Sequence, residues 1–115
     1  MPMTFRGPAE VADAYFAAIN ARDPAAIRAV FAPQAELVTP AGRFVGAAAI
    51  ADFYATQAFT APDLAAQPGP YLVDRQWLAV EIVLQMHGQR SRVADVFDVR
   101  DGVIQRLTIY LGGPA

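Results

Sequence analysis

The stretch that decides the fold is WLAVEIVLQMHGQRSRVADVFDV, residues 77–99. Apolar residues occupy every even position from Leu78 to Met86, and the polar residues Glu81 and Gln85 fall between them. A period of two puts each row on its own face of a β-strand. His87-Gly88 then forms a two-residue turn. The stretch therefore predicts a β-hairpin whose even positions on the first strand face the core.

The turn also fixes which residues of the second strand face inward. A two-residue turn pairs Val80 with Asp95, so Val93, Asp95 and Phe97 share the apolar face and Arg92 points the other way. Burial disfavours a charged carboxyl group, so the pKa of Asp95 should be raised and the group should stay protonated. Two interpretations remain open. Asp95 is either a structural aspartate held by a hydrogen bond or an arginine, or a functional acid.

Along the chain, the spacing of apolar residues changes once, from the helical period of about 3.6 residues to the strand period of two. Helical spacing of apolar residues predicts helices at 8–20, 24–32 and 47–59, with Asp23 as the N-cap of the second. Residues 60–70, which contain three prolines, read as a loop. Alternating patterns predict strands at 35–39, 43–46, 71–75, 77–86, 90–99 and 103–111. The order predicts an α+β domain over 1–115 with a short tail at 1–7, in which a curved, mostly antiparallel sheet wraps the helices as a cone.

Composition narrows the class of partner. Hydrophobic residues make up 55% of the 115-residue chain and charged residues 17%, which suggests an apolar cavity or an apolar surface buried in an oligomer. A net charge of −2 argues against nucleic acid as a partner. No apolar run is long enough for a membrane helix, and the N-terminus lacks a signal-peptide pattern. We therefore expect no membrane partner and a cytoplasmic location.

The reactive side chains exclude several chemistries. There is no cysteine and no lysine, which removes thiolate and Schiff-base mechanisms. The single serine, Ser91, and the single histidine, His87, lie in one hairpin, which makes a catalytic triad improbable. Neither a histidine-rich metal site nor a glycine-rich phosphate loop is present. We expect no metal and no cofactor, which leaves carboxylates, tyrosines, arginines and threonines for any chemistry.

The segment AELVTPAG, residues 35–42, could supply a catalytic base from one of two positions. Glu36 and Thr39 lie three residues apart, so on a strand they point to opposite faces. Leu37 belongs inside, and Thr39 shares its face. The strand therefore predicts that Thr39 faces the interior and Glu36 faces outward, which leaves Asp95 as the strong interior carboxylate.

The chain resembles the bacterial ketosteroid isomerases of the NTF2-like (SnoaL-like) superfamily. The resemblance runs from about residue 8 to 111 and is carried by YFAAINARDPAAIRAVFA, AELVTPAG, GAAAIADFYA, ADVFDV and DGVIQRLTIYLG. It implies the NTF2-like cone. Those isomerases use a tyrosine and a protonated aspartic acid as an oxyanion hole, with a second aspartate as base. The resemblance places the oxyanion-hole pair on Tyr15 and Asp95, a supporting tyrosine on Tyr54, and the base on Thr39.

The residue at position 39 is a departure from that pattern, because a threonine has no useful basicity near neutral pH. Tyr15 and Tyr54 also fit a second interpretation, as core tyrosines with satisfied hydroxyl groups. If the resemblance extends to the site, Tyr15 and Asp95 should reach each other or one shared ligand atom, with Thr39 across the pocket. The aligned positions also imply an apolar ligand-binding wall, although each member equally fits a plain core role: Ile19, Val30, Phe53, Val80, Ile82, Val93, Phe97, Leu107, Ile109 and Leu111.

Three functions remain open. The first is an isomerase-like enzyme that binds an apolar carbonyl or phenolic molecule and moves a proton through Asp95 or a water held by Thr39. The second is a non-catalytic small-molecule-binding dimer, and the third is a different enzyme such as a SnoaL-like polyketide cyclase or an epoxide hydrolase. An epoxide hydrolase of this fold typically needs an Asp and an Arg together in the interior, whereas Arg92 and Arg106 are predicted to face outward. Apolar residues on the outer sheet face suggest a homodimer through the sheets: Val83, Ala94, Val96 and Tyr110.

Overall fold

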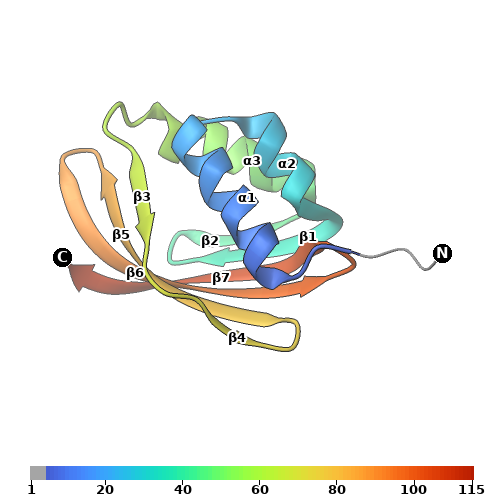
Figure 1. Cartoon of the computed structure of the whole chain (residues 1–115). Coiled ribbons are helices and arrows are strands. Elements are labelled where there is room, and N and C mark those ends of the chain that lie inside the picture. Colours follow the sequence, from blue (N-terminus) through green and yellow to red (C-terminus); the bar gives the residue numbers. More distant parts are fainter. Residues whose placement is uncertain (1–4) are drawn as a thin grey trace.

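The computed structural model describes residues 5–115, and in this range three α-helices lie on one side of a curved seven-stranded sheet (Figure 1). The helices are α1 (Pro8–Ala21), α2 (Pro24–Val30) and α3 (Ala47–Thr56), followed by a short 3₁₀ helix, η1 (Ala58–Thr60). The strands are β1 (Phe31–Thr39), β2 (Gly42–Val45), β3 (Ala65–Pro68), β4 (Leu72–Asp74), β5 (Trp77–Met86), β6 (Gln89–Arg100) and β7 (Val103–Pro114). The predicted α+β cone is confirmed.

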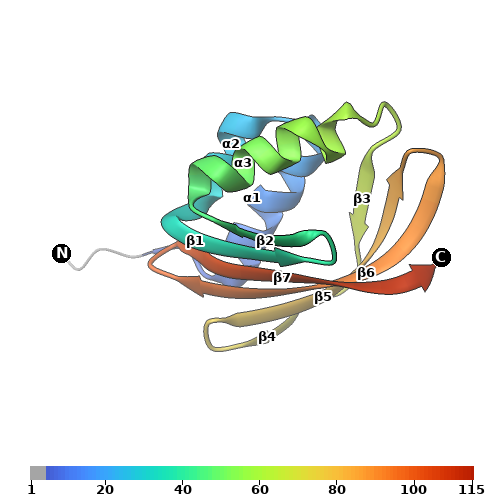
Figure 2. The ribbon, with the colours of Figure 1, turned by 180° about the vertical axis from the view of Figure 1, so that it is seen from behind.

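The sheet is mixed and unclosed. Its strand order is β2-β1-β7-β6-β5-β3, with β4 paired to β5 on a separate path. The pairing of β1 with β7 is parallel, and the other pairs are antiparallel. Figure 2 shows from behind how α3 lies over the β1–β2 hairpin. The long strands curve around the helices, so one face of the sheet lines the interior.

The β5–β6 register agrees with the sequence prediction. Val80 pairs with Asp95, and the turn residues His87 and Gly88 have φ angles of 52° and 78°. Two positive φ values are typical of the type I′ turn that matches the twist of a hairpin. The register places Phe97 in the fully buried core with Leu37 of β1 and Leu107 of β7.

Several predicted bounds differ from the structure: the third helix ends at Thr56 and not at residue 59, β1 begins at Phe31 and not at residue 35, and β7 continues to Pro114 and not to residue 111. Two further differences have a clear physical cause. The second helix was expected to continue to Ala32, but it ends at Val30, and Phe31 already pairs with Ile104 of β7. Pro33 explains the early end, because the residue before a proline is driven out of the helical conformation. Residues 60–70 were expected to form a loop, yet Ala65–Pro68 forms β3 on β5. The three prolines hid this strand, whose place at the sheet edge tolerates a proline.

Side chains fasten β3 and its preceding loop to the neighbouring elements. The Asn20 amide exchanges two hydrogen bonds with the Ala66 backbone, at 3.0 and 2.8 Å. Arg22, at the C-terminus of α1, donates to the carbonyls of Ala61, Pro62 and Leu64. The Gln85 amide donates a hydrogen bond to the Asp63 carboxylate, and so do the backbone N–H groups of Gly88 and His87. These hydrogen bonds lower the pKa of Asp63 to about 2.

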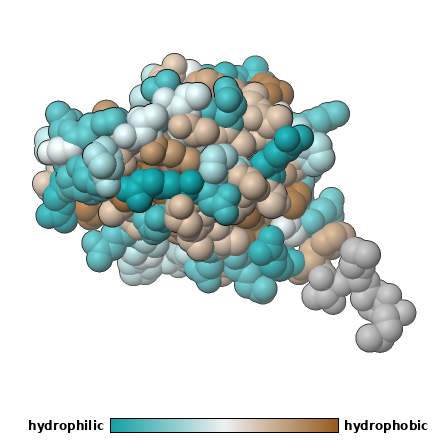
Figure 3. Space-filling view, turned by 90° about the horizontal axis from the view of Figure 1, so that it is seen from above, coloured by the Kyte–Doolittle hydropathy of each residue, from teal (hydrophilic) through white to brown (hydrophobic). Residues whose placement is uncertain are grey.

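The predicted tail at 1–7 is described only in part. Residues 1–4 lie outside the described range, and residues 5–7 precede α1 without regular secondary structure. Within residues 5–115, no helix has the length and hydropathy needed to cross a bilayer. Seen from the helix side, hydrophobic residues gather in the middle of the surface and hydrophilic residues lie around them (Figure 3).

Candidate active site

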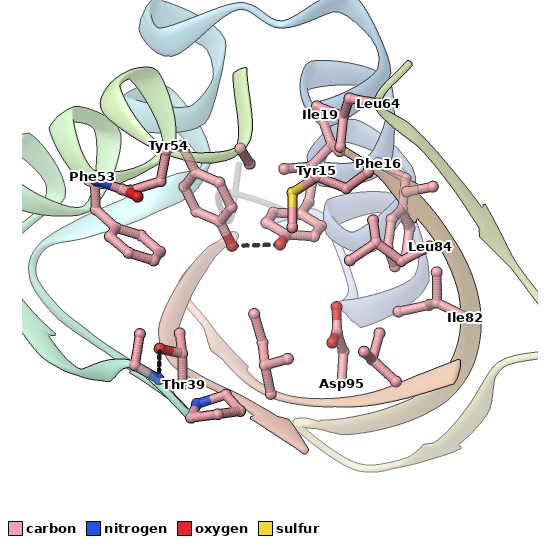
Figure 4. Close-up of a pocket in the computed structure, with 18 residues that line it drawn as sticks. Tyr15, Phe16, Ile19, Thr39, Phe53, Tyr54, Leu64, Ile82, Leu84 and Asp95 are labelled. Atoms are coloured by element: carbon pink, nitrogen blue, oxygen red, sulfur yellow. Dashed lines mark hydrogen bonds between the residues drawn. The ribbon is translucent and has the colours of Figure 1, made fainter. Parts of the chain in front are cut away.

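A cavity of about 260 Å³ lies between α1, α3 and the concave face of the sheet (Figure 4). Its polar lining residues are Tyr15, Thr39, Tyr54, Gln57 and Asp95. The remaining lining residues are apolar: Phe16, Ile19, Pro40, Ala41, Phe53, Ala58, Leu64, Ala66, Ile82, Leu84, Met86, Val93 and Ile109. An apolar cavity with a few polar groups is the usual form of a small-molecule site.

Tyr15 of α1 and Tyr54 of α3 form a hydrogen-bonded pair inside the cavity. Their hydroxyl oxygens lie 2.5 Å apart, and both side chains are buried. Burial raises the pKa of each phenol, and the neighbouring Tyr54 and Asp95 raise the pKa of Tyr15 further. Both hydroxyl groups therefore stay neutral at physiological pH. If Tyr54 donates to Tyr15, the Tyr15 O–H is free to donate to a bound molecule.

Asp95 of β6 reaches the same cavity from the sheet. The residue is 3% exposed, and its Oδ1 atom has no hydrogen-bond partner among the described residues. Burial raises the pKa of Asp95 to about 8. The carboxyl group is therefore mostly protonated at pH 7, and in that form it can donate a hydrogen bond.

The two tyrosines and Asp95 face one common space, but neither tyrosine forms a hydrogen bond with Asp95 across it. Figure 4 shows the hydroxyl groups of Tyr15 and Tyr54 and the Asp95 carboxyl group facing the same central space. Tyr15 bonds to Tyr54, and no hydrogen bond joins either tyrosine to Asp95 in the described structure. Direct Tyr15–Asp95 contact, one of the two geometries expected from the sequence, is therefore not formed. The other, a shared ligand atom, stays a prediction.

Thr39 lines the cavity from the end of β1, on the opposite side from the Tyr15–Tyr54 pair (Figure 4). Its Oγ1 atom accepts from the Ala41 N–H at 3.0 Å and donates to the Gly42 carbonyl at 3.3 Å. The hydroxyl group is therefore engaged in the β1–β2 turn. Glu36 lies on the other face of β1, where it pairs with Arg43 at 2.9 Å. The position of Thr39 in the cavity lining and the ion pair of Glu36 both agree with the orientation that the sequence predicts for this strand.

The predicted wall residues divide into three groups. Five line the cavity: Ile19, Phe53, Ile82, Val93 and Ile109. Four are buried in the core outside its lining: Val30, Val80, Phe97 and Leu107. The structure differs for Leu111, which is 64% exposed. The pairing of β1 with β7 ends at Val38–Thr108, so Leu111 lies beyond the part of β7 that pairs with β1.

Other lining residues were not named as site residues from the sequence. Leu84 and Met86 belong to the even, apolar row of β5, so the alternation that located the core could have found them. Leu64 and Ala66 come from the segment read as a loop, and no periodic signal marks them. Gln57 follows the last turn of α3 and also had no marker in the sequence.

The other charged residues of the sheet do not line the cavity. Arg92 faces Glu81 at 3.6 Å, and the Arg106 guanidinium lies 5.6 Å from the centre of the Trp77 ring. Asp98 is 8% exposed and lies 3.4 Å from the Arg100 Nε atom. Asp95 is thus the one carboxylate among the described lining residues, which form no cluster of metal ligands.

Known proteins share this architecture. A family profile for the SnoaL-like domain matches residues 12–107. A candidate ketosteroid isomerase from Kribbella flavida DSM 17836 is 22% identical with a TM-score of 0.80, covering 92% of this chain and 78% of its own. A candidate polyketide cyclase from Sinorhizobium meliloti is 26% identical with a TM-score of 0.77, covering 87% and 93%.

A protein of unknown function with a cystatin-like fold, from Methylobium petroleophilum PM1, is 22% identical with a TM-score of 0.83, covering 98% of this chain and 82% of its own. No curated protein matches the chain at a significant level. The profile match spans most of the helices and strands that form the cone. This chain therefore belongs to the SnoaL-like domain family of the NTF2-like superfamily.

Proposed function

We propose that this protein binds a planar, apolar carbonyl or phenolic molecule inside the cone and stabilises negative charge on its oxygen. The observation that carries the proposal is the unpaired Asp95 carboxyl group, buried in the wall that faces the Tyr15–Tyr54 pair. A buried polar group without a partner costs free energy, so such a group is uncommon unless it serves a function. An oxygen placed between the two groups would satisfy both.

Each polar residue has a distinct role in this proposal. The Tyr15 O–H and the protonated Asp95 carboxyl group donate hydrogen bonds to the ligand oxygen, as an oxyanion hole does. Tyr54 is a positioning residue, because its hydroxyl group holds that of Tyr15 at 2.5 Å. The apolar walls exclude water and strengthen the hydrogen bonds that reach the oxygen.

The proposed reaction is an isomerase-type proton transfer. A base takes a proton from the carbon next to the carbonyl group, the oxygen becomes an enolate oxygen, and the proton returns to another carbon. Thr39 cannot be that base. A pKa of about 8 leaves a fraction of Asp95 ionised at neutral pH, so Asp95 is the lining group able to accept the proton. With one carboxylate for two roles, we expect slow turnover.

A polyketide cyclase is the second candidate, supported by the 26% identity to the candidate cyclase from Sinorhizobium meliloti. Ring closure by carbon–carbon bond formation also passes through an enolate, so the same donors would serve it. Here Asp95 would act mainly as the base. A binding protein without catalysis remains the simplest alternative, because it needs the two donors and no base.

Titration with 2-naphthol tests the role of Asp95. We expect wild type to bind this flat phenol best, Asp95→Asn less well and Asp95→Leu least. Asparagine still donates a hydrogen bond but a weaker one, and leucine donates none. 2-Naphthol and the protonated Asp95 carboxyl group are both neutral near pH 7, so losing their hydrogen bond costs about 0.5–1.5 kcal/mol, which is about twofold to tenfold in affinity. Fluorescence or calorimetric titration near neutral pH gives the dissociation constants of wild type and of the two variants, once both variants have been shown to be folded. Equal affinities would mean that Asp95 does not contact the ligand.

We also propose that two copies associate through the outer face of the sheet. Ala94 pairs with Tyr110, and Val96 with Ala79 and Thr108, so these side chains form one continuous patch on that face. Tyr110 is 57% exposed. The ion-paired Glu81 and Arg92 lie beside the patch and give it both signs of charge, which suits a self-complementary twofold contact.

Light scattering during size-exclusion chromatography tests this association. Val96→Glu places a charge at the centre of the patch, and we expect it to convert a dimer into a monomer without unfolding the chain. Ala29→Glu, on the exposed side of α2, is the matched control and should keep the wild-type mass. A monomeric wild type at all concentrations would contradict the proposed dimer.

A further inference from the structure

A second hollow lies directly outside the cavity, against α3. It has a volume of about 510 Å³ and is lined by Ala41, Phe44, Ala49, Asp52, Phe53, Thr56 and Gln57. Three of these residues, Ala41, Phe53 and Gln57, also line the cavity inside the cone. The outer hollow, called here the α3 groove, is therefore separated from the cavity by single side chains.

Phe53 is the largest of the three shared residues. Its ring stacks on Phe44 of β2, with ring centres 4.1 Å apart, and meets the Tyr54 ring at 5.7 Å. The side chain is only partly buried, which leaves room for it to change rotamer. In Figure 4 it stands at the side of the cavity next to Tyr54. Phe53 therefore forms the largest part of the boundary between the cavity and the α3 groove.

The two spaces differ in chemistry. The cavity is apolar apart from its five polar lining residues, Tyr15, Thr39, Tyr54, Gln57 and Asp95. The α3 groove combines apolar side chains with the Asp52 carboxylate, the Gln57 amide and the Thr56 hydroxyl group, which bonds back to the Asp52 carbonyl at 2.9 Å. A carboxylate and an amide accept hydrogen bonds from hydroxyl groups. The groove therefore suits a chain that carries hydroxyl groups.

We propose that the α3 groove is a second subsite, which binds a hydroxylated extension of the ligand whose ring system lies in the cone, and that Phe53 is the specificity residue between them. This inference rests on the proposed binding of an apolar ring in the cavity. The ligand class is then narrower: a flat carbonyl or phenolic ring system with a short hydroxylated chain at the end remote from its anchored oxygen.

The experiment compares two probes, 2-naphthol and 6-(3-hydroxypropyl)-2-naphthol, by fluorescence titration. The measured quantity is the ratio of their affinities in each variant. Phe53→Ala removes the partition and should raise the ratio in favour of the extended probe by about tenfold. Thr56→Trp fills the groove from outside and should lower the ratio by about tenfold. Phe53→Leu makes a smaller change in the same direction as Phe53→Ala and serves if the alanine variant does not fold.

Two controls separate the groove from general effects. Leu84→Ala enlarges the cavity on the opposite wall, and Ala29→Trp adds an indole to α2 away from both spaces. Neither should change the ratio by more than about twofold. Two results would contradict the subsite: Leu84→Ala raises the affinity ratio as much as Phe53→Ala, or Thr56→Trp leaves the ratio unchanged. If 2-naphthol binding still depends on Asp95 in that case, the proposed function stands without the subsite. If 2-naphthol does not bind, or Asp95→Leu does not weaken it, the proposed function fails and the subsite with it.

Discussion

Thr39→Asp should raise the rate at which this protein isomerises a β,γ-unsaturated steroid ketone by about a hundredfold to ten-thousandfold, the usual contribution of a general base. The two proposed donors to the enolate oxygen, Tyr15 and Asp95, already line the cavity, and position 39 lies across it from the Tyr15–Tyr54 pair (Figure 4). Wild type should be slow, because Asp95 would have to act as both acid and base. Initial rates from the ultraviolet absorbance of the conjugated product measure the difference.

The local structure should accept this substitution. Thr39 accepts a hydrogen bond from the Ala41 N–H, and an aspartate side chain makes the same kind of turn. One carboxylate oxygen can hold the turn while the other faces the cavity. Thr39→Asn is the matched control, since it can form the turn but cannot take a proton, and it should give no increase. Fast turnover by wild type would mean that another base exists. A folded Thr39→Asp variant that binds the ketone and stays inactive would mean that the cavity is not organised for this reaction.

Stability should fall as the pH rises, and Asp95 is the reason. Its folded-state pKa is raised to about 8, whereas an unfolded aspartate has a pKa of about 4. Between these values the unfolded chain has lost the proton and the folded chain keeps it. The unfolded state therefore gains stability from each further unit of pH, on the order of 1 kcal/mol per unit. Below pH 4 both states are protonated and the effect is absent. Above about pH 8 both are ionised and it levels off.

Urea unfolding of wild type and Asp95→Asn at pH 5, 6, 7 and 8 measures this effect. Asparagine does not titrate, so the wild-type free energy of unfolding should decrease relative to that of the variant as the pH rises. Asp63 does not interfere, because its lowered pKa of about 2 adds stability above pH 4 that is lost only on acidification towards pH 2. A difference between the two proteins that stays constant from pH 5 to 8 would mean that Asp95 is already ionised or paired in the folded state.

Much of this architecture could be predicted from local pattern. The alternation in β5 and the two-residue turn at His87-Gly88 determine the β5–β6 register, and that register alone places Asp95 on the inner face. The Asp23 cap and Pro24 define the start of α2, where the Asp23 carboxylate accepts from the N–H groups of Ala25 and Ala26. These features depend on residues that are close together in the sequence, so they can be predicted without knowledge of the tertiary structure.

The parts that were missed depend on contacts between distant segments. β3 has a weak strand pattern and forms because Ala66 can pair with Leu84 and bond to Asn20. Leu107 and Leu111 are both on the same face of β7 by alternation. Leu107 pairs with Leu37 of β1 and is buried, whereas Leu111 lies beyond the end of that pairing and is exposed. The 2.5 Å contact between Tyr15 and Tyr54 depends on how α1 packs relative to α3, which periodicity does not report.

The parallel pairing of β1 with β7 has a consequence for how the chain folds. Glu36 pairs with Arg106, 70 positions later, so this contact closes a long loop and forms late compared with the local hairpins. β1 carries Thr39 and β6 carries Asp95, and β7 is the strand that joins them in one sheet. During synthesis, the edge of β6 has no neighbouring strand until β7 has left the ribosome, because β7 is the strand that pairs with it. We therefore expect Thr39 and Asp95 to reach their places on the two sides of the cavity only once β7 has paired with both β1 and β6.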